Sequence, residues 1–590
     1  MPLRLFPSPR VLHERGGAGA PADARVRHRV DDGLPPEGFA LEIGDGGVHL
    51  AARDAAGRRH GEAALAQIRA QARDALPALA LRDWPDFPVR GLMLDVSRDR
   101  VPTRATLARL VALLARLRMN HLELYVEHTF AYREHETVWQ DASPLTPEDL
   151  RWLDSLCAAQ GIELAANQNC FGHMERWLRH AAYRERAEAP DGFELQGLGR
   201  RPPAVLAPTP ENAAFALDLV HELMQNLKSR RVHIGCDETF ELGRGKSRAD
   251  VAARGRGRVY LEHLLRLVEP LRREGCEVLF WGDIVRQHAE LVPELPREGI
   301  VACVWHYEAP IDPAALPPAV REIAARFGMD DAALRGFAGQ LGAFADARVP
   351  FWVCPGTSSW NSLIGRLPNA RANLLDAAEQ GGAHGARGYL VTDWGDHGHL
   401  QPPSISFAPL LLAAGAAWNA ALHRDLDLAA ALDAVVFEDE AGVLGGVCEE
   451  LGALGDATGA RALNASPLAA ALLPAAGLRS FGGASAEATL RVVARLEAAR
   501  ERLAAAHPRC EDGALIVREL AQAIRLARHG AWRLARESGG AAPSDAALRR
   551  DLDEAIEGQR ACWLLRSREG GLADSLARLE ATRALYGGSD

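Results

Sequence analysis

From Val89 onward the sequence alternates short apolar runs with amphipathic helical stretches, and this alternation constrains the fold more than any other feature. The runs are residues 90–98, 120–127, 162–169, 232–238, 277–283, 299–306, 349–356 and 388–396. Near-continuous apolar strands separated by helices are typical of a parallel sheet covered on both faces. Eight such units predict an α/β protein whose residues 86–424 form a closed (β/α)8 TIM barrel. An open doubly wound sheet is the structural rival, but no G-x-G-x-x-G follows the first run.

A small α/β domain is predicted before the barrel, at residues 1–85. Two short alternating strands are joined at the Gly-rich turn 44–47, which is typical of a hairpin. A helix is expected from about Gly61, and Pro85 and Pro88 then interrupt the chain before the first barrel strand.

Beyond about Asp425 the strand pattern disappears. Apolar residues recur at helical spacing in residues 488–506, 514–537 and 546–569, which predicts an all-helical domain over 425–590. Its residues 563–575 are the part expected to reach the barrel. Residues 307–348 are expected to form an insertion after the sixth strand.

Composition excludes several classes of function. Hydrophobic residues make up 48% and charged residues 25% of the 590, the balance of an ordinary globular protein. A net charge of −10 argues against a general nucleic-acid binder, and no long uncharged apolar run indicates a membrane span. Nine cysteines without a C-x-x-C pair, and an N-terminal apolar stretch too short for a signal peptide, predict a reduced, cytoplasmic protein without structural zinc.

Polar and aromatic residues follow nearly every predicted strand. In a barrel of this kind the loops after the strands build the active site. Aromatic rings can stack on sugar rings, and Asp and Arg can bind hydroxyls, so a sugar site is expected there. The residues concerned are Asp95, Arg98, Glu127, Asn167, Asn169, His173, Asp237, Glu238, Trp281, Asp283, Trp305, Tyr307, Trp360, Trp394 and Asp396.

Each of these residues also has a purely structural interpretation. A tryptophan at a strand end is more often core than binding surface, and Asp95 with Arg98 could be a structural ion pair. Asp237 and Glu238 could be an acidic cluster at a helix N-terminus. The convergence of such groups at most of the predicted strand ends favours the functional interpretation.

Four segments resemble glycoside hydrolase family 20, the β-N-acetylhexosaminidases. Residues 232–238 (VHIGCDE) resemble the family's H-x-G-G-D-E signature, with Cys236 where glycine is usual. Residues 87–98 are similar to its first strand. Gly172-His173 resembles its P-G-H, with Phe171 replacing the proline, and residues 394–396 resemble its W-x-E, with Asp in place of Glu. The resemblance runs from about residue 35 to 420.

The resemblance implies an exo-acting enzyme that retains configuration, because the substrate's own 2-acetamido group serves as nucleophile. Glu238 is then the general acid and base, and Asp237 orients and stabilises the acetamido group through an oxazolinium intermediate. No cofactor and no metal are implied. The implied substrate is a small oligosaccharide or glycoconjugate with a terminal N-acetylhexosamine, with no nucleic-acid or membrane partner.

The same resemblance assigns roles to the surrounding residues. Arg98 is expected to bind the 3- and 4-hydroxyls of the terminal sugar, and Asp396 its 4- or 6-hydroxyl. His173 and Glu127 are expected to support Glu238. Trp281, Trp305 and Trp394 are expected to line the pocket for the acetamido group and to stack on the sugar ring. The donor to the acetamido oxygen is left open between Trp360 and Tyr307.

Two other functions are alternatives to hydrolysis assisted by the substrate's acetamido group. A metal-dependent barrel hydrolase would need clustered His and carboxylate ligands, which the first strand lacks. A non-catalytic sugar-binding protein would keep the site without turnover, and the intact Asp237–Glu238 pair argues against it. The sequence leaves open the gluco or galacto preference, the natural aglycone and association into homodimers.

Overall fold

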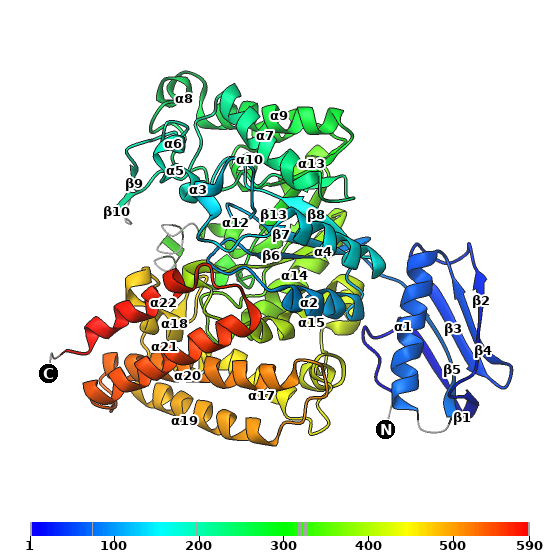
Figure 1. Ribbon diagram of the computed structural model, residues 1–590. Helices are drawn as coiled ribbons and strands as arrows, with labels where there is room; N and C mark the ends of the chain where they lie inside the picture. The colour runs from blue at the N-terminus through cyan, green and yellow to red at the C-terminus, as the bar shows by residue number, and fades with distance from the viewer. Residues whose placement is uncertain are drawn as a thin grey trace.

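A computed structural model gives the structure of the protein, and it describes residues 3–72, 75–195, 199–316, 318, 321, 322, 325 and 329–587. Figure 1 shows an N-terminal α/β unit beside a central barrel and a bundle of helices packed against another side of that barrel. The part of the 307–348 insertion between residues 316 and 329 falls largely outside the described residues.

The N-terminal unit is a five-stranded sheet covered by one long helix. Its strands follow the order β1-β5-β3-β4-β2. They are β1 (Val11–Pro21), β2 (Val26–Val30), β3 (Phe39–Gly44), β4 (Gly47–Ala52) and β5 (Ala75–Asp83). The predicted hairpin is present as β3 and β4, paired antiparallel up to Gly44 and Gly47.

Helix α1 (Ala55–Gln71) begins six residues earlier than expected, because the side chain of Asp54 accepts a hydrogen bond from the Gly57 N–H and caps it. Strand β5 was not predicted, and it pairs with both β1 and β3. Its leucines fill the core of this sheet, so long-range packing overrides local helix propensity.

The predicted eight-stranded barrel is confirmed. Its strands form the closed, all-parallel order β11-β12-β13-β14-β15-β6-β7-β8. The strands are β6 (Val89–Asp95), β7 (His121–Tyr125), β8 (Glu163–Asn167), β11 (Arg231–His233), β12 (Glu277–Trp281), β13 (Ile300–Trp305), β14 (Phe351–Cys354) and β15 (Gly388–Asp393). Every predicted run overlaps one of them, and β6 and β11 each begin one residue before the predicted run.

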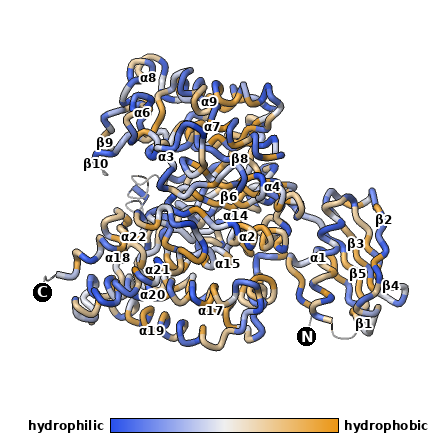
Figure 2. Tube along the Cα trace, viewed as in Figure 1, coloured by the Kyte–Doolittle hydropathy of each residue, from blue (hydrophilic) through white to orange (hydrophobic). Residues whose placement is uncertain are grey.

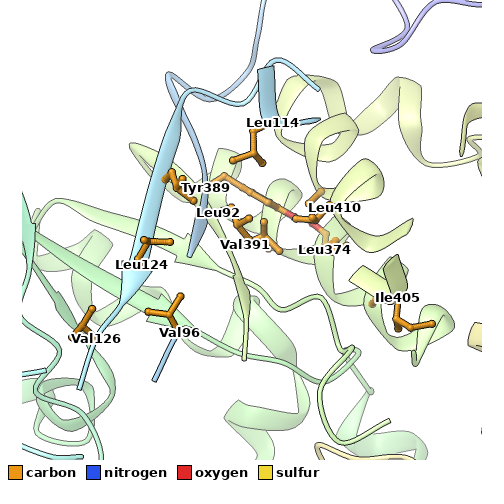
Figure 3. Packing of buried hydrophobic residues seen from close by; sticks show 14 of the residues in the cluster. Leu92, Val96, Leu114, Leu124, Val126, Leu374, Tyr389, Val391, Ile405 and Leu410 are labelled. Atoms are coloured by element: carbon orange, nitrogen blue, oxygen red, sulfur yellow. The ribbon is translucent and has the colours of Figure 1, made fainter. Parts of the chain in front are cut away.

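Long helices surround these strands: α2 (Arg104–Arg116), α4 (Pro147–Ala159), α7 (Pro210–Met224), α9 (Arg256–Arg273), α14 (Leu367–His384) and α15 (Pro403–His423). Figure 3 shows part of the core between strands and helices, formed by Leu92, Leu124, Tyr389, Val391, Leu114, Leu374 and Leu410. Burial of each large side chain of this kind stabilises the fold by about 1.5–3 kcal/mol.

The expectation that the sequence has no long uncharged apolar run was wrong: helix α15 is long and apolar enough to cross a membrane by length and composition, the one such helix in the described part of the chain. Inside this protein 83% of its apolar stretch is buried. It packs against the barrel strands on one side and against other helices on the other, and its Trp418 is part of the hydrophobic core of the N-terminal sheet. The hydropathy tube in Figure 2 shows apolar residues concentrated in the sheets and on helix faces directed at them.

Shorter elements fill the connections. After the barrel strands lie α3 (Glu136–Trp139), α5 (Glu175–Leu178), α6 (Ala181–Arg184), β9 (Phe193–Leu195), β10 (Gly199–Arg201), α8 (Arg248–Arg254), α10 (Asp283–Arg286), α12 (Asp331–Leu334) and α13 (Gly342–Ala347). The 3₁₀ turns there include η1 (Ala289–Glu294), η2 (Pro313–Ala315), η3 (Gly336–Gly339) and η4 (Asp396–Gly398).

The C-terminal region is helical, as expected. Its elements are α16 (Leu428–Ala431), the π-helix η5 (Leu432–Phe437), α17 (Leu444–Leu454), α18 (Pro467–Leu472), α19 (Ala486–Arg502), α20 (Gly513–Glu537), α21 (Asp545–Arg566), α22 (Leu572–Glu580) and η9 (Ala581–Leu585), with a small hairpin of β16 (Arg461–Ala462) and β17 (Ser480–Phe481). The three predicted helical stretches correspond to α19, α20 and α21.

Candidate active site

The Asp237–Glu238 pair lies in a strained turn after β11. Gly235, Cys236 and Glu238 all have left-handed backbones, with φ of 66°, 73° and 49°. Non-glycine residues adopt this conformation only where their surroundings stabilise it. Asn169, which follows β8, stabilises the turn through two hydrogen bonds: its side-chain oxygen accepts the Cys236 N–H at 3.2 Å, and its amide donates to Asp237 Oδ1 at 2.8 Å.

This turn makes the two carboxyl groups converge on one imidazole. Nε2 of His173 lies 3.2 Å from Asp237 Oδ2 and 3.4 Å from Glu238 Oε2. Side chains of neighbours in an extended strand would point to opposite faces. Gly172 contributes to the approach, because a Cβ at that position would overlap the carbonyl oxygen of Asp237.

The three groups divide the charge between them. Burial by itself would lower the pKa of His173, but the charge and hydrogen bond of Asp237 raise it to about 10, so the ring is cationic at neutral pH. Burial would raise the pKa of Asp237, and the His173 cation and the hydrogen bonds from His173 and Asn169 lower it instead. Enclosure by the site and the Asp237 charge raise the pKa of Glu238.

Glu127 lies on the other side of the imidazole. Its Oε1 is 3.8 Å from His173 Nδ1 and accepts a hydrogen bond from the Tyr125 hydroxyl at 3.0 Å. Burial raises the pKa of Glu127, and the nearby cations Arg98 and His173 oppose that rise. Glu127 and His173 are therefore adjacent, as the sequence predicted, although they are too far apart for a short hydrogen bond.

Arg98 links the first strand of the barrel to the last. Its guanidinium donates to Asp95 at 3.0 Å and lies 3.3 Å from Asp396. The ring of Trp394 is 4.8 Å from the guanidinium carbon, within cation–π range. Asp95 is fully buried and also accepts the Gly395 N–H at 3.0 Å. Asp95 is thus a structural partner that orients Arg98.

The predicted tryptophans form one aromatic cluster, but they are not equally accessible. Trp305 and Tyr307 are stacked, with ring centroids 5.1 Å apart and an interplanar angle of 18°, and both are partly exposed. Trp281 is fully buried and Trp394 is only 7% exposed. The indole N–H of Trp394 donates to the Tyr307 hydroxyl at 2.9 Å. The accessible ring faces are therefore mainly those of Trp305 and Tyr307, and the buried Trp281 presents none.

The expectation that Trp360 could be a free donor needs correction. Its ring is buried, and its indole N–H donates to Asn464 Oδ1 at 2.8 Å. That partner belongs to the C-terminal region, which the sequence could not place beside strand β14. Tyr307 remains as the alternative donor.

Asp283 was noted at the end of the fifth strand but received no role. It is buried, its Oδ2 is 3.5 Å from the Glu238 N–H, and its Oδ1 has no hydrogen-bond partner. Burial and the charges of Asp237 and Glu238 raise its pKa to about 8. Asn169 is a second residue without a predicted role, and its signal was the N-Q-N after the third strand.

The described residues contain no group of three or more His, Cys, Asp or Glu arranged to hold a metal ion. The side chains that reach solvent at the site are instead Glu238, at 39% exposure, with Arg98 and Asp396 beside it. The arrangement offers a carboxyl with a raised pKa, a buried carboxyl with a lowered pKa, charged side chains that can bind hydroxyls, and aromatic ring faces.

Comparison with known proteins gives three results. The family model described as "Glycosyl hydrolase family 20, catalytic domain" matches residues 87–316. A β-hexosaminidase of Akkermansia muciniphila is 29% identical over 228 residues, which cover 35% of this chain and 46% of that protein. Hexosaminidase D of Homo sapiens is 24% identical over 236 residues, covering 38% and 46%. The chain thus spans about half the length of these curated relatives.

Solved structures resemble the chain in fold. A chitobiase of Flavobacterium johnsoniae superposes with a TM-score of 0.54 at 15% identity and covers 99% of both chains. An exo-β-N-acetylglucosaminidase of Vibrio harveyi, solved with N-acetylglucosamine, gives 0.54 at 16% identity, with 76% of this chain and 78% of that one. The Asp237–Glu238 turn lies inside the segment that the family model matches, and residues 87–316 are therefore similar to the catalytic domain of glycosyl hydrolase family 20.

Proposed function

We propose that the protein is an exo-acting, retaining β-N-acetylhexosaminidase that uses its substrate's acetamido group as nucleophile. The observation that carries the proposal is the convergence of Asp237 and Glu238 on one cationic His173. The pKa of Asp237 is lowered and that of Glu238 is raised, which is the direction that acid catalysis by one carboxyl and charge stabilisation by its neighbour require.

In the first step the acetamido oxygen attacks C1 and the bond from C1 to the leaving oxygen breaks. Glu238 donates its proton to that oxygen, while the Asp237 carboxylate accepts the acetamido N–H and stabilises the positive charge of the oxazolinium. In the second step the water oxygen attacks C1, the bond from C1 to the oxazolinium oxygen breaks and restores the acetamido group, and the Glu238 carboxylate takes the proton from the water. Two displacements at C1 leave the anomeric configuration unchanged.

The neighbouring groups orient the sugar and tune the acid pair. Arg98 and Asp396, 3.3 Å apart, are suited to bind the hydroxyls on the far side of the terminal ring. The partly exposed Trp305 and Tyr307 are suited to contact the ring and the acetamido group, with the Tyr307 hydroxyl as donor to the acetamido oxygen. His173 keeps Asp237 ionised, and Glu127 faces the other nitrogen of the same imidazole.

The substrate class follows from these assignments. A terminal N-acetylhexosamine on a small oligosaccharide or glycoconjugate presents the acetamido group and free hydroxyls that the site is arranged to bind. The names of the relatives, two hexosaminidases and an exo-β-N-acetylglucosaminidase, support the same class. The cytoplasmic location and the homodimer remain predictions.

A panel of aryl glycosides tests this function. We expect hydrolysis of 4-nitrophenyl β-N-acetylglucosaminide or β-N-acetylgalactosaminide, and a rate on 4-nitrophenyl β-glucoside lower by several orders of magnitude. Equal rates on the acetamido sugar and the plain glucoside would contradict the substrate-assisted route. Binding of N-acetylglucosamine without hydrolysis of any aryl glycoside would favour a non-catalytic sugar-binding protein.

A further inference from the structure

One of the segments through which the C-terminal helical region reaches the barrel rim is residues 566–578, which comprises the end of α21, the following turn and most of α22. Figure 1 shows this segment, in red, on the side of the helical bundle that faces the barrel. We call it the α21–α22 segment. It contacts the loop that carries Arg98.

Backbone bonds join the two pieces of chain. Residues 566–568 pair with residues 101–103, just beyond Arg98. Arg568 N–H donates to the Val101 carbonyl at 2.8 Å, Thr103 N–H donates to the Arg566 carbonyl at 2.9 Å, and Pro102 forms a bridge with Ser567. Residues 101–103 and 566–568 are therefore paired as in an antiparallel sheet, and this pairing fixes the end of the loop that carries Arg98.

Gly571 makes the closest approach. Its backbone is left-handed, with φ of 77°, and a Cβ there would overlap the carbonyl oxygen and the Cα of Asp99. Asp99 is the neighbour of Arg98 in the chain. Only glycine allows both this conformation and this contact.

Charged side chains reinforce the contact. The buried Arg100 donates from Nε to the Ser567 hydroxyl at 2.9 Å. The Asp99 carboxylate accepts a hydrogen bond from Arg176 at 2.7 Å, and the same guanidinium donates to Asp574 of α22 at 3.0 Å. The loop is thereby held to α22 as well as to the turn.

The same segment holds the loop after the last barrel strand. The Ser575 hydroxyl donates to the carbonyl of Gly398, two residues after Asp396. A Cβ on Gly398, whose φ is 97°, would press against the side chain of Arg578. Nearby, Gln559 of α21 donates to the Leu400 carbonyl at 3.0 Å. Both loops that supply hydroxyl-binding charges therefore rest on the helical region.

We propose that the α21–α22 segment is a positioning element of the active site, which fixes Arg98 and Asp396 for the 3-, 4- and 6-hydroxyls of the terminal sugar. This inference rests on the proposed function. Strand β6 ends at Asp95, so its sheet hydrogen bonds stop before Arg98. Asp95 fixes the loop before Arg98, through the N–H groups of Ser97 and Arg98, and the helical region fixes it afterwards. Binding groups work only when held within about 0.5 Å of their productive positions.

Two glycine variants of the full-length protein test the proposal. Gly571→Ala adds a methyl group against Asp99. Gly539→Ala is the matched control, because Gly539 is also left-handed, at φ of 79°, but has no atom within 4 Å of its Cβ position. Both variants carry the same kind of backbone strain, and only one disturbs the Arg98 loop.

The readouts are kcat and KM on 4-nitrophenyl β-N-acetylglucosaminide and on its 4-deoxy analogue. We expect Gly571→Ala to lower kcat/KM at least tenfold through a higher KM, and Gly539→Ala to stay within twofold of wild type. The wild-type preference for the parent sugar over the 4-deoxy sugar should shrink in Gly571→Ala alone. A displaced Arg98 no longer binds the 4-hydroxyl of the parent sugar, so the loss of that hydroxyl costs less.

Equal kinetics and equal 4-deoxy discrimination in the two glycine variants would overturn the proposal. If Gly571→Ala does not fold, Ser567→Ala replaces it in the test. This variant removes only the hydroxyl that accepts the hydrogen bond from Arg100. A smaller preference for the parent sugar over the 4-deoxy sugar would support the positioning role, and an unchanged preference would overturn it. Wild-type protein that hydrolyses none of the acetamido sugars would instead overturn the function on which the inference rests.

Discussion

His173 and Asp237 form a buried ion pair at the centre of the site, with the imidazole Nε2 3.2 Å from the carboxylate. The same nitrogen faces Glu238 at 3.4 Å, so one cation acts on both carboxyl groups. The His173 cation lowers the pKa of Asp237, while burial and the Asp237 charge raise that of Glu238.

Removal of either carboxyl should abolish most of the activity while leaving substrate binding largely intact. Asp237→Asn loses the charge that stabilises the oxazolinium, and groups of this kind typically contribute about 3–4 kcal/mol, or a factor of about 10²–10³ in kcat. Glu238→Gln loses the proton donor and should show a similar loss on substrates with poor leaving groups. Steady-state kinetics measure both, and near-wild-type kcat in either variant would refute the assignment.

Loss of the His173 cation should shift the acidic limb of the pH–rate profile. His173 has a left-handed backbone, with φ of 56°, so His173→Asn is the least disruptive change, because Asn tolerates that conformation. Asp237 must be ionised for activity, and the cation lowers its pKa. Without it the pKa of Asp237 rises, and the acidic limb of kcat/KM should move to higher pH. An unmoved acidic limb would show that His173 does not control Asp237.

Asp283 should influence the basic limb. The groups that face it are Asp237, Glu238, Cys236, Tyr260, Arg256 and Arg286. The pKa of Asp283 is raised to about 8 and that of Glu238 is also raised, and because the two carboxyl groups face each other, ionisation of one disfavours ionisation of the other.

Asp283→Asn keeps an acceptor for the Glu238 N–H and removes the titration. The basic limb should therefore move to lower pH, with kcat at the optimum changed only a few-fold. Asp283→Ala also removes the acceptor, and it should lower kcat further. Identical pH profiles for wild type and Asp283→Asn would exclude the coupling.

A buried ion pair between the N-terminal sheet and the barrel should contribute strongly to stability. Arg118 donates to Asp83 at 2.9 Å, and the indole of Trp418 donates to the same oxygen at 3.0 Å. Asp83→Ala leaves a buried guanidinium unpaired and should cost about 3–5 kcal/mol in the free energy of unfolding. Urea denaturation of wild type and Asp83→Ala measures this difference in the free energy of unfolding.

The control for that measurement is an exposed pair on helix α1. Arg58 and Glu62 lie 2.8 Å apart at i,i+4 spacing and both are exposed. Glu62→Ala should change the free energy of unfolding by no more than about 0.5 kcal/mol. Similar losses in the two variants would mean that the buried pair has no special role.

The barrel and the residues at its rim could be predicted because they depend on local patterns. Apolar runs with polar ends show each strand and the side chains beyond it, from Asp95 to Asp396. Strand β5 could not be predicted, because its pairing with β1 and β3 is a long-range contact that its alanine- and leucine-rich sequence does not reveal.

The details of the site depended on conformation and on distant chain. The left-handed backbone at Cys236 and Glu238, which makes neighbouring carboxyl groups converge, has no signature in residue type. The engagement of Trp360 by Asn464 and the contact of Gly571 with Asp99 join residues far apart in sequence. Asp283 stood at a predicted strand end, and only the packing shows that it faces Glu238.

The most direct test of the account is a series of 4-nitrophenyl N-acyl glucosaminides in which the acyl methyl carries zero, one, two or three fluorine atoms. Fluorine withdraws electrons from the acyl oxygen that is proposed to attack C1 next to Asp237. The account predicts that log kcat falls steadily along the series, by orders of magnitude overall. A kcat that does not depend on fluorination would contradict the acetamido nucleophile and with it the proposed role of Asp237.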